Sequence, residues 1–286
     1  MPLAPARLAV LATSALVGLA AVAGGCTRRT VAGLPPGVEV EDLPESESWD
    51  VRLRTSTDGV AEVALEAPYL ARYTRDSLYT YLGPAPGDAA AAPVTLRLFG
   101  PDGRPTGSVR AREVWMVEAD GRLVAEGAVR ASRLGSDGAT VEAARVVVQG
   151  ERIEAEGGVR AEVQGGGGAR VEAPRVVVGE GGAFTASGGA TVEIGGSAQA
   201  TVRARTVSGG GGRYEADGGV RVLASGGRVL EAGRVVWSEA AGRFTAPGAF
   251  RFDGPGERVR GVGLTASADL SRYSFRDVRG EIEVQE

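Results

Sequence analysis

The chain has 286 residues, a formal net charge of −4, 45 glycines, one cysteine and no histidine. All 32 basic residues are arginine, because the sequence contains no lysine. Without His or Lys the chain cannot form a Ser–His–Asp or Cys–His relay, a Schiff base or a Cys/His zinc site, which leaves carboxylates as the only catalytic option. The acidic balance argues against a nucleic-acid partner. We therefore expect a protein that is not an enzyme and that holds no cofactor or metal.

Residues 1–25 are predicted to be a signal peptide. Arg7 precedes an apolar run over 8–22, and small residues at 23–25 lead to Cys26. The run is short for a membrane span and lies where a secretory apolar region belongs. A cysteine after small residues resembles a bacterial lipobox, which implies lipidation of Cys26. An uncleaved anchor and a plain cleaved signal are the alternatives, and all three place the rest of the chain outside the cytoplasm.

Residues 26–50 are expected to form the lipidated N-terminus and a flexible tether. This segment contains three prolines and a cluster of acidic residues, and it lacks sustained apolar periodicity. The single cysteine excludes an intramolecular disulfide, so the remainder must be stabilised by packing.

Residues 51–286 contain a repeat of about thirty residues, which is the sequence signature of a stacked architecture. One anchor is the last residue of an apolar–polar–small triplet: Ala111, Ala143, Ala173, Ala204, Ala232 and Gly261. A second is a large apolar residue: Leu123, Ile153, Phe184, Tyr214, Phe244 and Tyr273. A third is a glycine that we expect to lie in a turn: Gly127, Gly157, Gly188, Gly218 and Gly248.

Apolar residues within each unit alternate with polar ones, which is typical of a strand with one dry and one wet face. We expect an all-β fold of stacked antiparallel units whose small apolar side chains point inward. The large anchor residues would form one wall of this interior. The inward residues, which we predict to contact an apolar ligand, are Val129, Ala131, Val159, Ala161, Val163, Val192, Ile194, Val220, Val222, Phe250 and Phe252.

The unit at 51–107 departs from the period, because an Ala/Pro-rich insertion from Gly83 to Pro93 lengthens one loop. An atypical terminal unit can cap a stack or provide a docking end. A loop tip without a role is the alternative.

The repeats resemble the OstA-type β-jelly-roll of the lipopolysaccharide-transport proteins LptA and LptC. The resemblance is carried by 141–148 and 153–159, by the closing segments 259–264 and 278–282, and by 67–73. It implies an open jelly-roll over 51–286 that shields the acyl chains of lipopolysaccharide or a related lipid. It also implies a periplasmic protein anchored in a membrane, with the inner membrane favoured. Whether the chain is similar to LptC, to LptA or to both is open.

The same resemblance implies that the lipid passes along a bridge between two membranes, driven by an ATP-dependent partner. Other bridge components would join by strand addition at an exposed edge such as 273–284. Charges on that edge serve equally well as protection against aggregation.

Two other functions compete with lipid transport. In a structural or adhesive β-solenoid lipoprotein, the two inner faces would pack together and leave no room for lipid. A hydrolase would need a carboxylate pair, but the candidate residues recur once per repeat on the predicted wet face: Glu113, Glu142, Glu172 and Glu231. That recurrence favours pairing with arginine on neighbouring strands. Arginines near a groove could also bind lipid phosphates.

Overall fold

The computed structural model describes residues 43–74, 78–134, 138–150, 152–163, 169–179, 183–194 and 200–278. The predicted signal peptide, Cys26 and most of the predicted tether lie outside these ranges. The described part contains 17 antiparallel strands of one sheet, and its only helical element is the short 3-10 turn Ser225–Gly227. No helix in these ranges is long and apolar enough to cross a membrane. The predicted all-β fold is confirmed.

The chain divides into two compact units. The N-terminal unit comprises 5–135 and 141–155, and the C-terminal unit comprises 136–140 and 156–286, together with the first four residues of the chain. Each is described below by itself.

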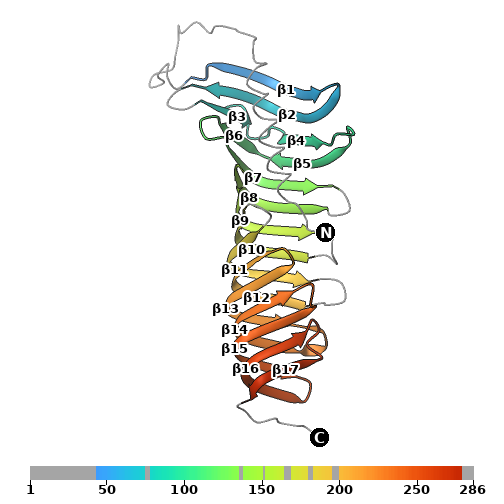
Figure 1. Ribbon diagram of the computed structural model, residues 1–286. Coiled ribbons are helices and arrows are strands. Elements are labelled where there is room, and N and C mark those ends of the chain that lie inside the picture. The colour runs from blue at the N-terminus through green and yellow to red at the C-terminus, as the bar shows by residue number, and fades with distance from the viewer. Residues whose placement is uncertain are drawn as a thin grey trace. The chain divides into compact units, whose positions relative to one another are not determined.

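The N-terminal unit is built on a long hairpin of β1 (Ser46–Thr57) and β2 (Val60–Tyr73). The free edge of β2 pairs with two short strands, β3 (Tyr79–Gly83) and β4 (Val94–Phe99). Residues 84–93, which form most of the predicted insertion, lie between these two strands. Thus β3 and β4 together occupy the place of one strand, broken in the middle (Figure 1).

A second broken strand follows the first. β5 (Pro105–Ala111) pairs with β4, while β6 (Glu113–Val117) pairs with β3. Both then pair with the uninterrupted β7 (Arg122–Arg133), and β8 (Ala139–Gln149) comes next. The core of this unit is apolar and its buried residues come from β2 to β7: Leu65, Ala67, Leu82, Val94, Ala111, Val114, Ala125 and Val129.

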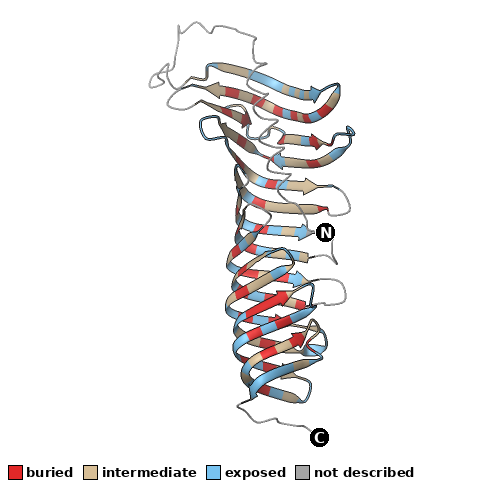
Figure 2. Ribbon diagram, in the orientation of Figure 1, coloured by how far each residue is buried: buried red, intermediate tan, exposed pale blue. Residues whose placement is uncertain are grey.

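The C-terminal unit is more regular, because each strand pairs with the next one along the chain (Figure 1). After β9 (Arg152–Val163), which begins before the division between units, its strands are β10 (Ala169–Val178), β11 (Phe184–Ile194), β12 (Ala200–Gly210), β13 (Arg213–Leu223), β14 (Val229–Ser238), β15 (Arg243–Gly254), β16 (Glu257–Ser267) and β17 (Tyr273–Val278). Figure 2 shows buried and exposed residues alternating along them, as expected for strands with one dry face.

The predicted turn glycines do not lie in turns. Gly127, Gly157, Gly188, Gly218 and Gly248 all lie inside strands, and the first four have positive φ. Around Gly188, residue Ser187 faces Thr206 and Ala190 faces Ala204, so two residues of β11 stand opposite one residue of β12. This is a β-bulge, which bends the strand. The prediction was wrong because glycine supplies positive φ both in turns and at bulges.

The large anchor residues of this unit follow one line of register, as the sequence predicts. Phe184 and Tyr214 both face Gly209 on β12, and their rings lie 6.1 Å apart. Trp237 pairs with both Tyr214 and Phe244, and Ala266 pairs with both Phe244 and Tyr273. The line of anchor residues therefore crosses β11 to β17. One residue of the intervening strand, Gly209, Trp237 or Ala266, separates each anchor from the next.

Candidate functional site

The predicted ligand-contacting residues lie on β7, β9, β11, β13 and β15, after the bend in each strand. Seven of them are buried: Val129, Val159, Val192, Val220, Val222, Phe250 and Phe252. Ala131, Ala161 and Ile194 are half-buried. The side chain of Val163 lies outside the described residues.

Several of these residues belong to one continuous line, which we call the apolar row. Cross-strand pairs connect its members from β10 to β16 in the order Val171, Val192, Val202, Val222, Leu230, Phe252 and Val259. Val222, Leu230 and Phe252 are 0% exposed. Sequence reasoning found Val192, Val222 and Phe252 but missed the members on even-numbered strands, although Val171, Val202 and Val259 open the repeated triplets.

A second buried line lies on the other side of the bends. Its paired members are Val176, Ala186, Val207, Ala216 and Val235. The two sides of the bend meet at β17. Tyr273 is in register with Phe244, which precedes the bend of β15. Its ring nevertheless lies 4.7 Å from the ring of Phe252, which follows that bend. The bent strands therefore enclose an interior between their two halves at this end of the unit.

The end of this interior is aromatic. Tyr273 contacts Phe252 and also lies 6.1 Å from Phe275, while its hydroxyl donates a 2.5 Å hydrogen bond to Glu257 Oε2. Burial and that hydrogen bond raise the pKa of Tyr273 to about 12, so the phenol stays protonated and donates at neutral pH. Leu270, which is 0% exposed, lies in the turn that precedes β17.

A pocket of about 630 Å³ lies at the bends of β13, β14 and β15. Val220 and Phe250, both predicted site residues, line it together with Ala232. Arg221 and Arg251 border it as well. Apolar side chains and guanidinium groups therefore adjoin one hollow of the surface, a combination that suits an amphiphilic ligand.

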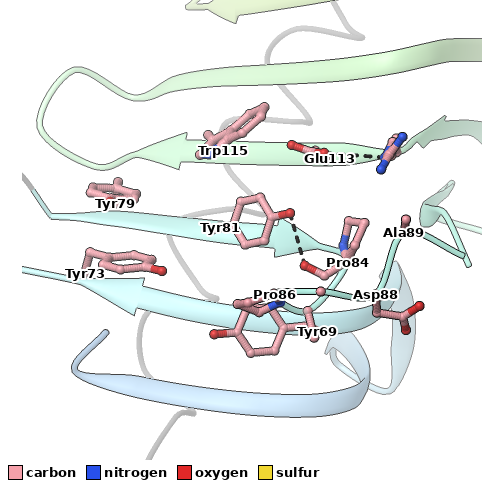
Figure 3. A pocket seen from close by; sticks show the side chains of 13 residues that line it. Tyr69, Tyr73, Tyr79, Tyr81, Pro84, Pro86, Asp88, Ala89, Glu113 and Trp115 are labelled. Carbon is pink, nitrogen blue, oxygen red and sulfur yellow. Dashed lines mark hydrogen bonds and ion pairs between the residues drawn. The ribbon is translucent and has the colours of Figure 1, made fainter. Parts of the chain in front are cut away.

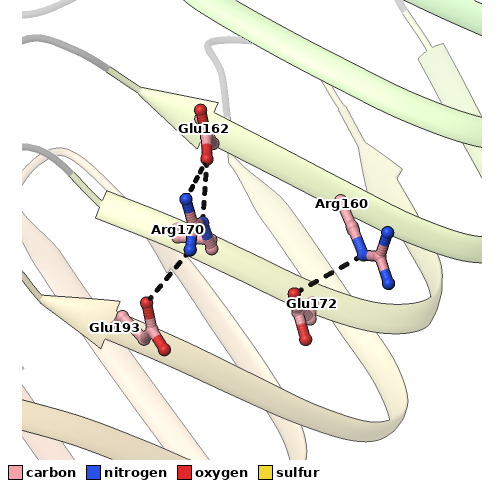
Figure 4. A network of polar contacts seen from close by, with 5 residues as sticks. All are labelled: Arg160, Glu162, Arg170, Glu172 and Glu193. Atoms are coloured by element: carbon pink, nitrogen blue, oxygen red, sulfur yellow. Dashed lines mark hydrogen bonds and ion pairs between the residues drawn. The ribbon is translucent and has the colours of Figure 1, made fainter.

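The outer face of the sheet carries pairs of Arg and Glu on adjacent strands. Arg160 Nε lies 3.5 Å from Glu172 Oε1. Arg170 contacts both Glu162 and Glu193, as Figure 4 shows. The predicted pairing of the once-per-repeat carboxylates with arginine is also present for Arg130 with Glu142 and Arg221 with Glu231. Glu113 differs, because it pairs with the adjacent Arg112.

These pairs sit in solvent and contribute little to stability, with a typical value below about 1 kcal/mol each. Each carboxylate in these pairs already faces an arginine, so the pairs do not supply two adjacent carboxylates of the kind that a glycosidase uses. Within the described ranges, no group of three or more His, Cys, Asp or Glu residues could hold a metal ion.

The N-terminal unit contains a second pocket, of about 480 Å³, which sequence reasoning missed. Four of the six tyrosines of the chain line it, together with Trp115. Two pairs come from neighbouring positions in the strands: Tyr73 faces Tyr79, and Tyr81 faces Trp115. The insertion after β3 supplies another side through Pro84, Pro86 and Asp88 (Figure 3).

The rings of this tyrosine pocket contact one another. Tyr73 and Tyr79 are stacked with centroids 4.6 Å apart, whereas Tyr81 is tilted at 53° against Trp115. The Tyr81 hydroxyl donates to the Pro84 carbonyl at 3.2 Å, which holds the start of the insertion against the sheet. Gly83 leaves space for this contact, because a Cβ there would lie 2.6 Å from the Tyr81 hydroxyl.

A signal for this pocket was present in the sequence. Tyr69 and Tyr73 are four residues apart and Tyr79 and Tyr81 are two apart, so each pair shares one face of its strand. A short connection between β2 and β3 brings the pairs together. The predicted site residues all lie in the regular repeats from Val129 onward, so the sequence analysis missed this cluster.

Comparison of the chain with models of known protein families finds no match. Comparison with curated protein sequences also finds none.

Proposed function

We propose that the protein is a non-catalytic lipid carrier that shields acyl chains in the interior of its bent strands and passes the lipid on. The ligand would be lipopolysaccharide or a related lipid, as the similarity of the repeats to LptA and LptC suggests. The observation that carries this proposal is the apolar row, which continues across seven strands with Val, Leu and Phe side chains. No polar side chain interrupts it.

The energetics suit a carrier. Each CH₂ group removed from water contributes about 0.8 kcal/mol, so several acyl chains can be held without a specific hydrogen bond. Such binding is loose in geometry, which favours transfer. Val222, Leu230 and Phe252 are 0% exposed, so the two halves of each bent strand would have to separate to admit an acyl chain. The bends carry Gly188, Gly189, Gly218 and Gly219, which lack a Cβ and therefore restrict a change of backbone conformation least.

The proposal extends to location and partners. Cys26 would anchor the protein to a membrane outside the cytoplasm, and the tether would give it reach. Within the part of the chain that the structure describes, β17 is the last strand of the C-terminal unit, and its residues from Ser274 to Asp277 are exposed. A strand from another component of a transport bridge would pair with this edge.

Mass spectrometry of lipid that co-purifies with the protein from its membrane tests the proposal. Val192→Trp fills the apolar row and should lower lipid occupancy, because the added ring takes the space of an acyl chain. The matched control is Thr191→Trp, which places the same ring on the opposite face of β11. Circular dichroism verifies that both variants are folded.

A structural spacer is the second candidate, favoured by the 0% exposure of Val222, Leu230 and Phe252. If the parent protein carries no lipid, or if Val192→Trp and the parent bind equal amounts, the carrier proposal fails and the spacer stands.

A further inference from the structure

The tyrosine pocket of the N-terminal unit has no part in the lipid-carrier proposal. The C-terminal unit makes its bends without any insertion, whereas here residues 84–93 interrupt a strand row and line a pocket. The insertion is folded onto itself, since Asp88 N donates to Ala85 O at 2.9 Å and Asp88 Oδ1 accepts from Ala90 N at 3.2 Å. Four of six tyrosines gather where this segment meets the sheet.

Two kinds of surface meet in the pocket. Tyr81, Trp115 and the stacked pair Tyr73–Tyr79 provide aromatic rings, and Figure 3 shows Tyr73 and Tyr79 on one side and Tyr81 beside Pro84. Aromatic faces carry partial negative charge and attract the weakly positive hydrogens of C–H groups. All of these rings are half-buried, so part of each stays open to solvent.

Polar groups surround the rings. Arg112, Glu113 and Asp88 line the same pocket, and Arg112 Nε lies 3.5 Å from Glu113 Oε1. Burial first, and the nearby Glu113 second, raise the pKa of the Tyr81 phenol, so it remains a neutral hydroxyl at physiological pH. Arg112 and Glu113 offset each other, which leaves the formal negative charge of Asp88. The lining therefore disfavours an anion, and its mixed donors and acceptors suit a neutral ligand with many hydroxyl groups.

We propose that the tyrosine pocket binds a saccharide of one or two rings, which stacks on Tyr81 and Trp115 and hydrogen-bonds to Arg112, Glu113 and Asp88. A pyranose has a C–H face for the aromatic rings and equatorial hydroxyls for the guanidinium and carboxylate groups. The volume of about 480 Å³ lies in the range of small-molecule pockets. An extended peptide fits less well, because the insertion borders the pocket. The inference does not depend on lipid binding in the C-terminal unit.

Saturation-transfer NMR on the full chain in phosphatidylcholine nanodiscs tests this inference, with empty nanodiscs as the baseline. The probes are the methyl glycosides of glucose, galactose, mannose and N-acetylglucosamine, together with maltose, each at about 10 mM, which reveals millimolar affinity. We expect at least one probe to bind. Tyr81→Ala should weaken that binding about tenfold or more, since it removes the central ring.

Trp115→Leu is the second variant, for use if Tyr81→Ala does not fold. The matched control is Tyr214→Ala, which removes a half-buried tyrosine in ring contact with Phe184 in the other unit and should leave saccharide binding unchanged. Val192→Trp should also bind saccharide as the parent does, so the two proposals can fail separately.

Hexyl β-glucoside compared with methyl β-glucoside identifies the source of the sugar. Tighter binding of the hexyl compound assigns the pocket to a glycolipid headgroup, and equal binding assigns it to a free saccharide. Binding of none of the probes would overturn the proposal, as would equal binding by the parent and Tyr81→Ala. Binding of a decaproline peptide in place of every sugar would assign the pocket to Pro-rich peptides and also overturn it.

Discussion

The N-terminal and C-terminal units bend their strands in different ways. In the C-terminal unit the chain passes through the bend without a break, because Gly188–Gly189 and Gly218–Gly219 adopt positive φ inside β11 and β13. In the N-terminal unit two strand rows break at the bend, between β3 and β4 and again at Arg112 between β5 and β6, whereas β7 continues through Gly127. A continuous strand keeps the repeat uniform, whereas a break admits an insertion. The tyrosine pocket formed at such a break.

Loss of packing where the two strand halves meet should give the largest effect. Phe252 is 0% exposed and contacts Tyr273 across the interior, so Phe252→Ala leaves a cavity and should lower the free energy of unfolding by about 3–5 kcal/mol. Urea denaturation measures this value. The control is Phe275→Ala, because Phe275 is 37% exposed and should cost about 1 kcal/mol. Similar losses from both variants would contradict the enclosed interior.

Substitution at a bend should have an intermediate effect. Gly218 and Gly219 have φ of 87° and 85°, so alanine at either position is strained by about 1–2 kcal/mol. A Cβ at Gly218 would also lie 2.7 Å from Arg205 Cβ, whereas a Cβ at Gly219 meets nothing within 4 Å. Gly218→Ala should therefore destabilise more than Gly219→Ala in thermal unfolding. Equal shifts in Tm would show that the cross-strand contact relaxes freely.

Removal of the insertion should have the smallest effect on stability. Tyr69 pairs with Gly83 and Glu66 pairs with Thr95, so one residue suffices to connect β3 and β4 along β2. We expect replacement of 84–93 by a single glycine to change the free energy of unfolding by about 1 kcal/mol or less, because shortening a loop changes its closure entropy little. Saccharide binding should be lost. Extensive unfolding in calorimetry would instead give the insertion a structural role.

Much of the fold was predictable because the alternation of apolar and polar residues within a short segment predicts a strand. Val141, Val171 and Val202 mark every second strand, β8, β10 and β12, at nearly constant spacing, and neighbouring strands along the chain are neighbours in the C-terminal unit. The nature of the bends was not predictable in the same way. Gly188 satisfies the requirement of a turn and of a bulge equally, and only the pairing of β12 with both sides of Gly188 distinguishes them.

The two candidate sites also differ in how far local alternation predicts them. The inward position of Val222 follows from alternation within its own strand, so the sequence predicts it. The tyrosine pocket needs two further facts, that Tyr73 faces Tyr79 and that the chain after Gly83 folds back over Tyr81. Both depend on the register between strands and on the course of an irregular segment, which local patterns do not determine.

Pairing between successive strands has a consequence for how such a chain folds and evolves. In β10 to β17 every hairpin closes between segments that are adjacent in the sequence, so folding can start at any hairpin and spread in both directions. Duplication or loss of one thirty-residue segment would leave the registers on both sides intact. Natural selection can therefore lengthen or shorten this protein in whole steps without redesigning its interior.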